Sequence, residues 1–357
     1  MTRPPASQPS AAAIGLVAIG RNEGRRLEAC LDAALAQLPP ERVVYVDSGS
    51  TDGSVAAARA RGVAAVALDP ADGFTAARAR NAGAAHLLEG ADPPAFVQFV
   101  DGDCRLAPGW LGTAHAAMEA DPRLAAAAGR RREVAPEASP WNRLCDMEWN
   151  TPVGEAAAVG GDALYRAAAL RAAGGFDGAM ICGEEPELCF RLRRLGWRIR
   201  RLDAEMTRHD AAMTRAAQWA RRTVRTGWAF AEGAARMGGS AEGYNRRERA
   251  RILGWGGVLP AAVLGLLLLA LLGTALGGLR GWALLAALAG LAGLAAYPLM
   301  ALRVAARRRA ARGDPWPHAL LYGAAVMAGK PFEMAGLMRY RTAARRGARG
   351  RIIEYKS

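Results

Sequence analysis

Cysteine is scarce in this chain, and its spacing argues against two common uses. The five cysteines are odd in number and form no C-x-x-C pair; they are Cys30, Cys104, Cys145, Cys182 and Cys189. Disulfide frameworks and structural zinc sites are usually built from cysteines at short, regular spacings. The sequence therefore disfavours both and indicates a reducing compartment.

The N-terminus lacks the long apolar segment of a secretory signal. Residues 1–13 contain proline and serine and are predicted to form a flexible tail. Without an apolar stretch behind a charged start, no signal peptide is expected. We therefore expect the domain that follows to remain in the cytosol.

Lysine is almost absent, so arginine carries the formal net charge of +14. Many arginines flank the apolar runs, at Arg246, Arg247, Arg249 and Arg251 before them and at Arg303, Arg307, Arg308, Arg309 and Arg312 after them. This placement fits anionic lipid headgroups better than a nucleic-acid groove. The lipid bilayer is thus a predicted partner, and no nucleic acid is.

Two long runs without charge lie at residues 253–279 and 282–302. Each is long enough to cross about 30 Å of hydrocarbon, so residues 253–302 are predicted to form two transmembrane helices. Because both outer flanks are rich in arginine, the hairpin should begin and end in the cytoplasm. The expected location is the cytoplasmic (inner) membrane, multi-pass, with the domain that precedes the spans facing the cytoplasm.

The segments around these runs are predicted to lie at the membrane surface. Residues 213–252 form an amphipathic, basic linker, with a helix expected over 218–236 that either lies flat at the interface or packs on the domain. Residues 303–357 form a basic cytoplasmic tail. Its third apolar run is interrupted by Lys330, Pro331 and Glu333, which favours an interfacial or re-entrant segment near 319–338.

Residues 14–212 alternate between strand and helix patterns. Strands are predicted at 14–19, 43–46, 63–68 and 95–100, with helices between them, whereas 130–160 is expected to be irregular and to line an acceptor cleft. Such alternation predicts an α/β domain with a mostly parallel, Rossmann-like sheet and flanking helices. Ligands of these sheets bind beyond the carboxyl ends of the strands. Asn22, Glu23, Asp47, Asp101 and Asp103 all fall there.

Asp101-Gly102-Asp103 follows a predicted strand directly. Two carboxylates separated by one glycine can converge on a single hard cation, and oxygen ligands suit Mg²⁺ or Mn²⁺. The triplet alone is common in surface turns. Its position at the ligand-binding edge is what favours a metal.

Five motifs occur in order: Ile19-Gly20-Arg21-Asn22-Glu23, Val46-Asp47-Ser48-Gly49-Ser50-Thr51-Asp52-Gly53-Ser54, Val100-Asp101-Gly102-Asp103, Gly174-Gly175-Phe176-Asp177 and Gly183-Glu184-Glu185-Pro186-Glu187-Leu188. With these motifs the chain resembles the family-2 inverting glycosyltransferases of the GT-A fold. The likeness covers roughly residues 14–210. Each motif is weak, but the combination is specific.

The resemblance implies a role for each matching residue. Asn22, Glu23, Asp47, Arg80, Asn81 and Asp101 would bind the nucleotide sugar. Asp103, Asp101 and His209 would hold the metal, and an imidazole ligand would favour Mn²⁺ slightly over Mg²⁺. Glu185 matches the catalytic base, but this chain has Glu-Glu where the family more often has Glu-Asp, so Glu184 stays open as the base.

The predicted activity is sugar transfer from a nucleotide-sugar donor to a lipid-linked or membrane-proximal saccharide in cell-surface polysaccharide or glycolipid assembly. Other proteins of such an assembly pathway are predicted partners. An alternative acceptor is polyprenyl phosphate. A dehydrogenase is disfavoured because no G-x-G-x-x-G follows the first strand. A non-enzymatic membrane scaffold with a degenerate sugar-nucleotide domain is disfavoured by the intact Asp47, Asp101, Asp103 and Glu185.

Overall fold

The computed structural model describes residues 13–275 and 280–347, and it divides the chain into two compact units, Met1–Ala212 and Met213–Ser357. Apart from Ala13, the predicted N-terminal tail lies outside the described residues. So do residues 276–279, at the end of the first predicted span, and residues 348–357 of the predicted basic tail. Each unit is described separately below.

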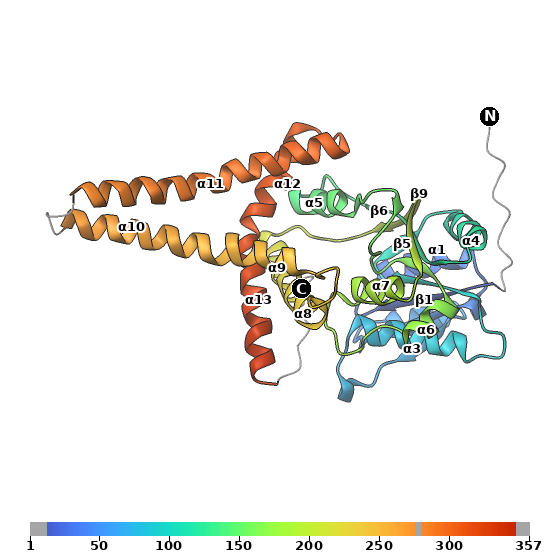
Figure 1. Ribbon diagram of the computed structural model, residues 1–357. Coiled ribbons are helices and arrows are strands. Elements are labelled where there is room, and N and C mark those ends of the chain that lie inside the picture. The colour runs from blue at the N-terminus through green and yellow to red at the C-terminus, as the bar shows by residue number, and fades with distance from the viewer. Residues whose placement is uncertain (1–12, 276–279, 348–357) are drawn as a thin grey trace. The chain divides into compact units, whose positions relative to one another are not determined.

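The first unit begins with a parallel half-sheet. Its strands are β1 (Ile14–Gly20), β2 (Val43–Asp47), β3 (Ala64–Ala67) and β4 (Phe96–Asp101), in the spatial order β3-β2-β1-β4. All pairings among them are parallel, as the alternation predicts. Helices α1 (Arg25–Leu35), α2 (Ser54–Ala60) and α3 (Ala76–Leu88) connect them, and α1 and α3 cover opposite faces of the sheet (Figure 1).

The register of these strands places the polar loops together. Gly20 pairs with Asp47 on one side of β1, and Ile19 pairs with Asp101 on the other. The carboxyl ends of β1, β2 and β4 therefore stop at the same edge of the sheet. The predicted location of Asn22, Glu23, Asp47 and Asp101 at one edge is confirmed.

The other half of the sheet is mixed. It contains β5 (Cys104–Leu106), β6 (Leu124–Glu133), β7 (Gly154–Glu155), β8 (Ala163–Arg166) and β9 (Arg198–His209), and it continues the order as β4-β8-β6-β9-β5 with β7 on β9. The β6–β9 pair is parallel, whereas β8, β5 and β7 pair antiparallel. Helices α4 (Trp110–Ala120), α6 (Ala167–Ala173) and α7 (Glu184–Arg194) complete this half.

The prediction that residues 130–160 are irregular is wrong. β6 runs on to Glu133, and α5 (Pro140–Trp149) follows it. The start of α5 is well signalled, because the Ser139 side chain accepts a hydrogen bond from the Asn142 backbone and Pro140 occupies the first turn. The arginines at the end of β6 give the sequence no apolar strand pattern there, and the strand is defined by its pairing with β9.

The second unit is helical. It contains α8 (Ala216–Met237), α9 (Arg246–Leu253), a π-helical turn (Gly254–Val258), α10 (Leu259–Ala275), α11 (Arg280–Arg312), α12 (Trp316–Ala328) and α13 (Lys330–Arg345). The continuous helices Arg246–Ala275 and Gly281–Arg312 are long and apolar enough to cross a membrane by length and composition. α10 and α11 lie side by side (Figure 1).

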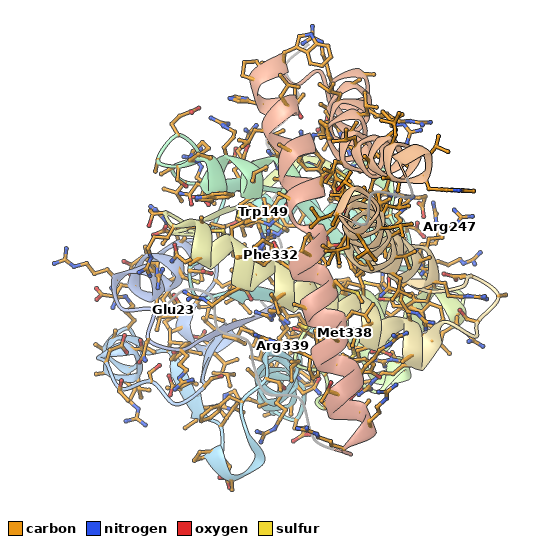
Figure 2. The ribbon with its side chains drawn as sticks, turned by 90° about the vertical axis from the view of Figure 1, so that its left-hand side faces the viewer. Glu23, Trp149, Arg247, Phe332, Met338 and Arg339 are labelled. Atoms are coloured by element: carbon orange, nitrogen blue, oxygen red, sulfur yellow. The ribbon has the colours of Figure 1, made fainter. Side chains whose placement is uncertain are left out.

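Within this unit, α8 and α13 approach backbone to backbone. A Cβ added at Gly227 would lie 2.0 Å from the carbonyl oxygen of Glu333, and one at Gly336 would lie 2.0 Å from that of Val224. A glycine on each helix therefore allows the two backbones to approach this closely. α13 also carries exposed apolar side chains, Phe332 and Met338, beside Arg339 (Figure 2). Its placement at a membrane interface stays a prediction.

Candidate active site

Two loops at the sheet edge are joined by hydrogen bonds. Asn22, with a positive φ of 55°, accepts a bond from the Thr51 backbone N–H at 2.7 Å, and its own N–H donates to Ser50 Oγ at 2.9 Å. Asp52 accepts from the Gly24 N–H at 3.1 Å. The loop after β1 and the loop after β2 thus form one polar wall, in which Asn22 is a central member.

Asp47 shapes the second loop from within. It is buried, and its carboxylate accepts hydrogen bonds from the backbone N–H groups of Gly49 and Ser50 at 3.0 and 2.9 Å and from the Tyr45 hydroxyl at 2.9 Å. Gly49 has a φ of 80°, and a Cβ there would lie 2.7 Å from the Phe74 ring. Asp47 therefore holds the turn whether or not it also contacts a base or ribose, a role that stays a prediction.

Glu23 and Asn81 both have protein partners. Glu23 forms an ion pair with Arg26 at 3.0 Å. The Asn81 amide accepts from the Phe176 N–H at 2.9 Å and donates to the Phe176 carbonyl at 2.7 Å. Asn81 thus fixes the loop that precedes α7, and nucleotide contact by either residue stays a prediction.

Arg80 joins three of the predicted carboxylates. Its guanidinium is buried and lies 2.9 Å from Asp101 Oδ1, 2.8 Å from Glu184 Oε1 and 3.2 Å from Glu185 Oε1. Burial by itself lowers the pKa of Arg80, but the charges of Glu185, Asp101 and Glu184 outweigh it, so the net pKa is raised. One permanently charged side chain therefore connects the end of β4 to the start of α7, and Arg80 bonds to these carboxylates rather than pointing to solvent.

The two glutamates at the start of α7 differ in exposure. The Glu184 side chain is 3% exposed and is held by Arg80, whereas that of Glu185 is 17% exposed. Burial, followed by the neighbouring charge of Glu184, raises the pKa of Glu185 to about 7. A carboxylate with a pKa near neutrality suits proton abstraction from a hydroxyl. These observations favour Glu185 over Glu184 as the base.

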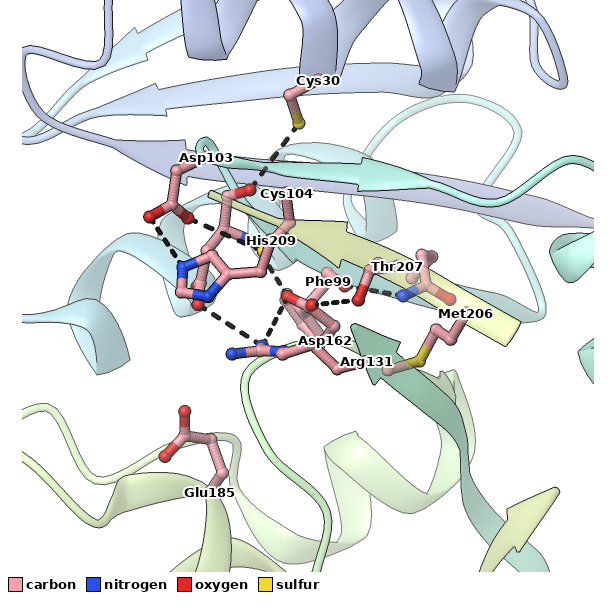
Figure 3. A network of polar contacts seen from close by, with 12 residues as sticks. Cys30, Phe99, Asp103, Cys104, Arg131, Asp162, Glu185, Met206, Thr207 and His209 are labelled. Carbon is pink, nitrogen blue, oxygen red and sulfur yellow. Dashed lines mark hydrogen bonds and ion pairs between the residues drawn. The ribbon is translucent and has the colours of Figure 1, made fainter. Parts of the chain in front are cut away.

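Asp103 and His209 meet at the end of β4 and β9. His209 Nε2 lies 2.8 Å from Asp103 Oδ2, and both residues are buried (Figure 3). Burial, with a further contribution from Arg131, lowers the pKa of His209 to about 4, so its imidazole is neutral near pH 7. Cis ligands of an octahedral Mg²⁺-like ion lie about 2.9 Å apart. The carboxylate and neutral imidazole therefore fit a shared divalent cation.

Asp101 faces arginines and does not join this pair. Its carboxylate lies 2.9 Å from Arg80 and 3.6 Å from Arg131. Within the described ranges, the groups whose donor atoms converge are Asp103–Cys104–His209 and Asp101–Cys104–Asp162. Metal ligation by Asp101 stays a prediction, and its visible role is to hold two guanidinium groups.

Arg131, Asp162 and Trp149 lie near Asp103 and His209 but were not singled out as site residues from sequence. Asp162 is buried and accepts hydrogen bonds from the Asp101 N–H at 3.2 Å and from the Thr207 hydroxyl at 2.7 Å. It also pairs with Arg131 at 2.9 Å. Trp149 packs against His209 at an interplanar angle of 60°, with ring centroids 4.6 Å apart, and its ring centroid lies 5.5 Å from the Arg131 guanidinium. The one sequence feature that could have indicated Asp162 is its position directly after the glycine pair Gly160-Gly161.

Comparison with known proteins identifies the first unit. Residues 17–159 match the model for Glycosyl transferase family 2. The chain contains a family 2 glycosyltransferase domain. The matched segment of this glycosyltransferase includes Asn22, Asp47, Arg80, Asp101 and Asp103, and the structure adds the later Asp162, Glu184, Glu185 and His209 to the same region of the domain. No curated protein matches the chain.

One of the similar solved structures supports the same fold. A mannosyltransferase from Pyrobaculum calidifontis, in complex with GDP-Man and Mn²⁺, is 20% identical and has a TM-score of 0.55, with 92% of this chain and 87% of that chain covered. Residues 1–349 of S. aureus TarS are 14% identical with a TM-score of 0.49, over 94% of this chain and 91% of that one. At such identities the first likeness shows that the glycosyltransferase has a GT-A-like fold, and no more.

Proposed function

We propose that this glycosyltransferase moves a sugar from a nucleotide-sugar donor to a lipid-linked saccharide, with inversion at the anomeric carbon. The observation that carries the proposal is the bridge made by Arg80, which brings Glu185 to the end of the strand that precedes Asp103. A base and a metal-binding pair from distant parts of the chain thereby flank one region.

Glu185 performs the proton transfer. Its carboxylate takes the proton from the acceptor hydroxyl while that oxygen bonds to the anomeric carbon and the bond to the diphosphate breaks. Glu184 and Asp101 keep Arg80 in place beside it. The transition state carries oxocarbenium character, as in glycoside hydrolysis.

Asp103 and His209 are the residues that would hold Mn²⁺ or Mg²⁺. Such an ion, when bound, offsets negative charge on the departing nucleoside diphosphate. The neutral imidazole offers a lone pair and the carboxylate an anionic oxygen, which is the donor set that these ions accept. The buried Asp162, just before β8, accepts a hydrogen bond from Thr207 on β9 beside them.

The pH profile should report the base. Because the pKa of Glu185 is raised to about 7, only its deprotonated form above that pH can accept a proton. We expect kcat/KM to rise with pH up to about 7 and then level off, with about a tenfold fall per pH unit below it. Rates measured from pH 5 to 8 at saturating Mn²⁺ test this. A flat profile through neutrality would show that another group accepts the proton.

The acceptor is inferred from the second unit. Two helices apolar enough to cross a membrane, flanked by arginine-rich segments, support an active site that works close to the bilayer. An enzyme held at the bilayer by these helices can reach a lipid-linked substrate, whereas transfer to a soluble saccharide would not require the helices. The donor sugar can be found by thermal-shift screening of the detergent-purified chain with UDP-, GDP- and dTDP-sugars and Mn²⁺.

Radiolabelled donor and membrane extract test the acceptor. We expect label in the organic phase with the full chain and none with the Glu185→Gln variant. Release and sizing of the labelled glycan then separates a lipid-linked saccharide from a single sugar on polyprenyl phosphate, which is the alternative acceptor. Product confined to the aqueous phase would contradict both lipid acceptors.

A further inference from the structure

A thiol lies beside the two side chains proposed to hold the metal. Cys104 on β5 is directly opposite His209 on β9 in an antiparallel pair, so the two side chains leave the sheet on the same face with Cβ atoms about 5 Å apart. Cys104 Sγ lies 3.6 Å from Asp103 Oδ1. A sulfur, a ring nitrogen and a carboxylate oxygen therefore all lie within 4.8 Å of one another (Figure 3).

These three donors are shielded from water. Cys104 is 0% exposed, Asp103 3% and His209 5%. A buried carboxylate, imidazole and thiol whose donor atoms converge are ligand types that hold Zn²⁺ in proteins.

We propose that Asp103, Cys104 and His209 capture a thiophilic divalent cation, Zn²⁺ or Cd²⁺, and that this capture inhibits the glycosyltransferase. The proposal rests on the proposed function, since the inhibitory ion and the catalytic cation share Asp103 and His209. Thiolate and imidazole ligands favour Zn²⁺ over Mn²⁺, both by softness and by the Irving–Williams order. On binding, the Cys104 thiol releases its proton to solvent and its sulfur bonds to the ion.

Inhibition follows from coordination geometry. A Zn²⁺ ion with oxygen, nitrogen and sulfur ligands from the protein is tetrahedral and keeps one open position. A cation that prefers six ligands and was held by Asp103 and His209 would have several positions left for phosphate oxygens. The thiophilic ion is thus held more tightly by the protein but holds the donor diphosphate poorly.

Cobalt spectroscopy tests the thiol directly. The detergent-purified full chain is titrated with Co²⁺, and we expect a sulfur-to-cobalt charge-transfer band that is lost in Cys104→Ser and in Cys104→Ala and kept in Cys145→Ser. Cys145 is a matched control, because it is equally buried but belongs to neither converging group. The Zn²⁺ concentration that halves transfer at fixed Mn²⁺ should rise at least about tenfold in Cys104→Ser.

The outcomes separate the inference from the function on which it rests. Mn²⁺-dependent donor binding by the unaltered chain is measured in parallel, and its absence would remove the shared metal site and the proposed function with it. If Mn²⁺ binds but Co²⁺ gives no charge-transfer band, or Zn²⁺ inhibits the unaltered chain and Cys104→Ser equally, the thiophilic site is wrong. The band of the unaltered chain decides this even where a Cys104 variant fails to fold.

Discussion

Replacing Glu185 with glutamine is expected to lower kcat by about 10²–10⁴-fold while donor binding is kept. The amide preserves the size of the side chain and its place at the start of α7, but it cannot accept a proton from the acceptor hydroxyl. Single-turnover transfer and equilibrium donor binding, measured on the same preparation, give the two quantities. An undiminished rate would exclude Glu185 as the base.

Glu184→Gln is the matched control for this experiment. Glu184 is the buried neighbour that bonds to Arg80 at 2.8 Å, so its loss of charge leaves a buried guanidinium with fewer counterions. We expect a lower unfolding temperature with a smaller loss of kcat than in Glu185→Gln. A larger loss of kcat in Glu184→Gln, with stability unchanged, would exchange the roles of the two residues.

Asp103→Ala is expected to weaken Mn²⁺-dependent donor binding by at least about 100-fold, because it removes an anionic ligand from the proposed metal pair. Binding of the nucleotide sugar is measured over a Mn²⁺ titration, with and without chelator. His209→Ala should behave in the same way, since its Nε2 lies 2.8 Å from the Asp103 carboxylate.

His115→Ala serves as the control for this pair. His115 lies on α4 and packs edge-on against Phe96, with ring centroids 5.3 Å apart, and it belongs to neither converging group. Its removal should leave the Mn²⁺ titration unchanged. Donor binding by Asp103→Ala that responds to Mn²⁺ as the unaltered chain does would place the metal elsewhere.

The parallel half of the sheet could be predicted because its signals are local. Buried strands such as Ile14–Gly20 are short apolar runs, and the helices between them repeat apolar residues at helical spacing. Asp47 and Asp101 stand at strand ends, so their shared edge follows from the topology alone. The long apolar helices of the second unit can likewise be predicted from composition.

The contacts that define the site could not be predicted in this way. Arg80 bonds to Glu184 across 104 positions of the chain, and His209 meets Asp103 across 106. No periodicity in the sequence relates residues so far apart. β6 was not predicted because the arginines at its end are typical of a polar loop. Asp162 and Trp149 were missed for the same reason, since each acts through partners on other elements.

The sequence by itself determined the strands and helices of the parallel half of the sheet and the long apolar helices, and which carboxylates stand at the open edge of the sheet, because hydrophobic periodicity and strand ends are local properties. Tertiary structure alone decided that Arg80 holds Asp101 and Glu184, that Glu185 is the more exposed glutamate, and that Cys104 faces His209. Those choices depend on strand register and on the burial of charge, and both arise only when distant segments pack together.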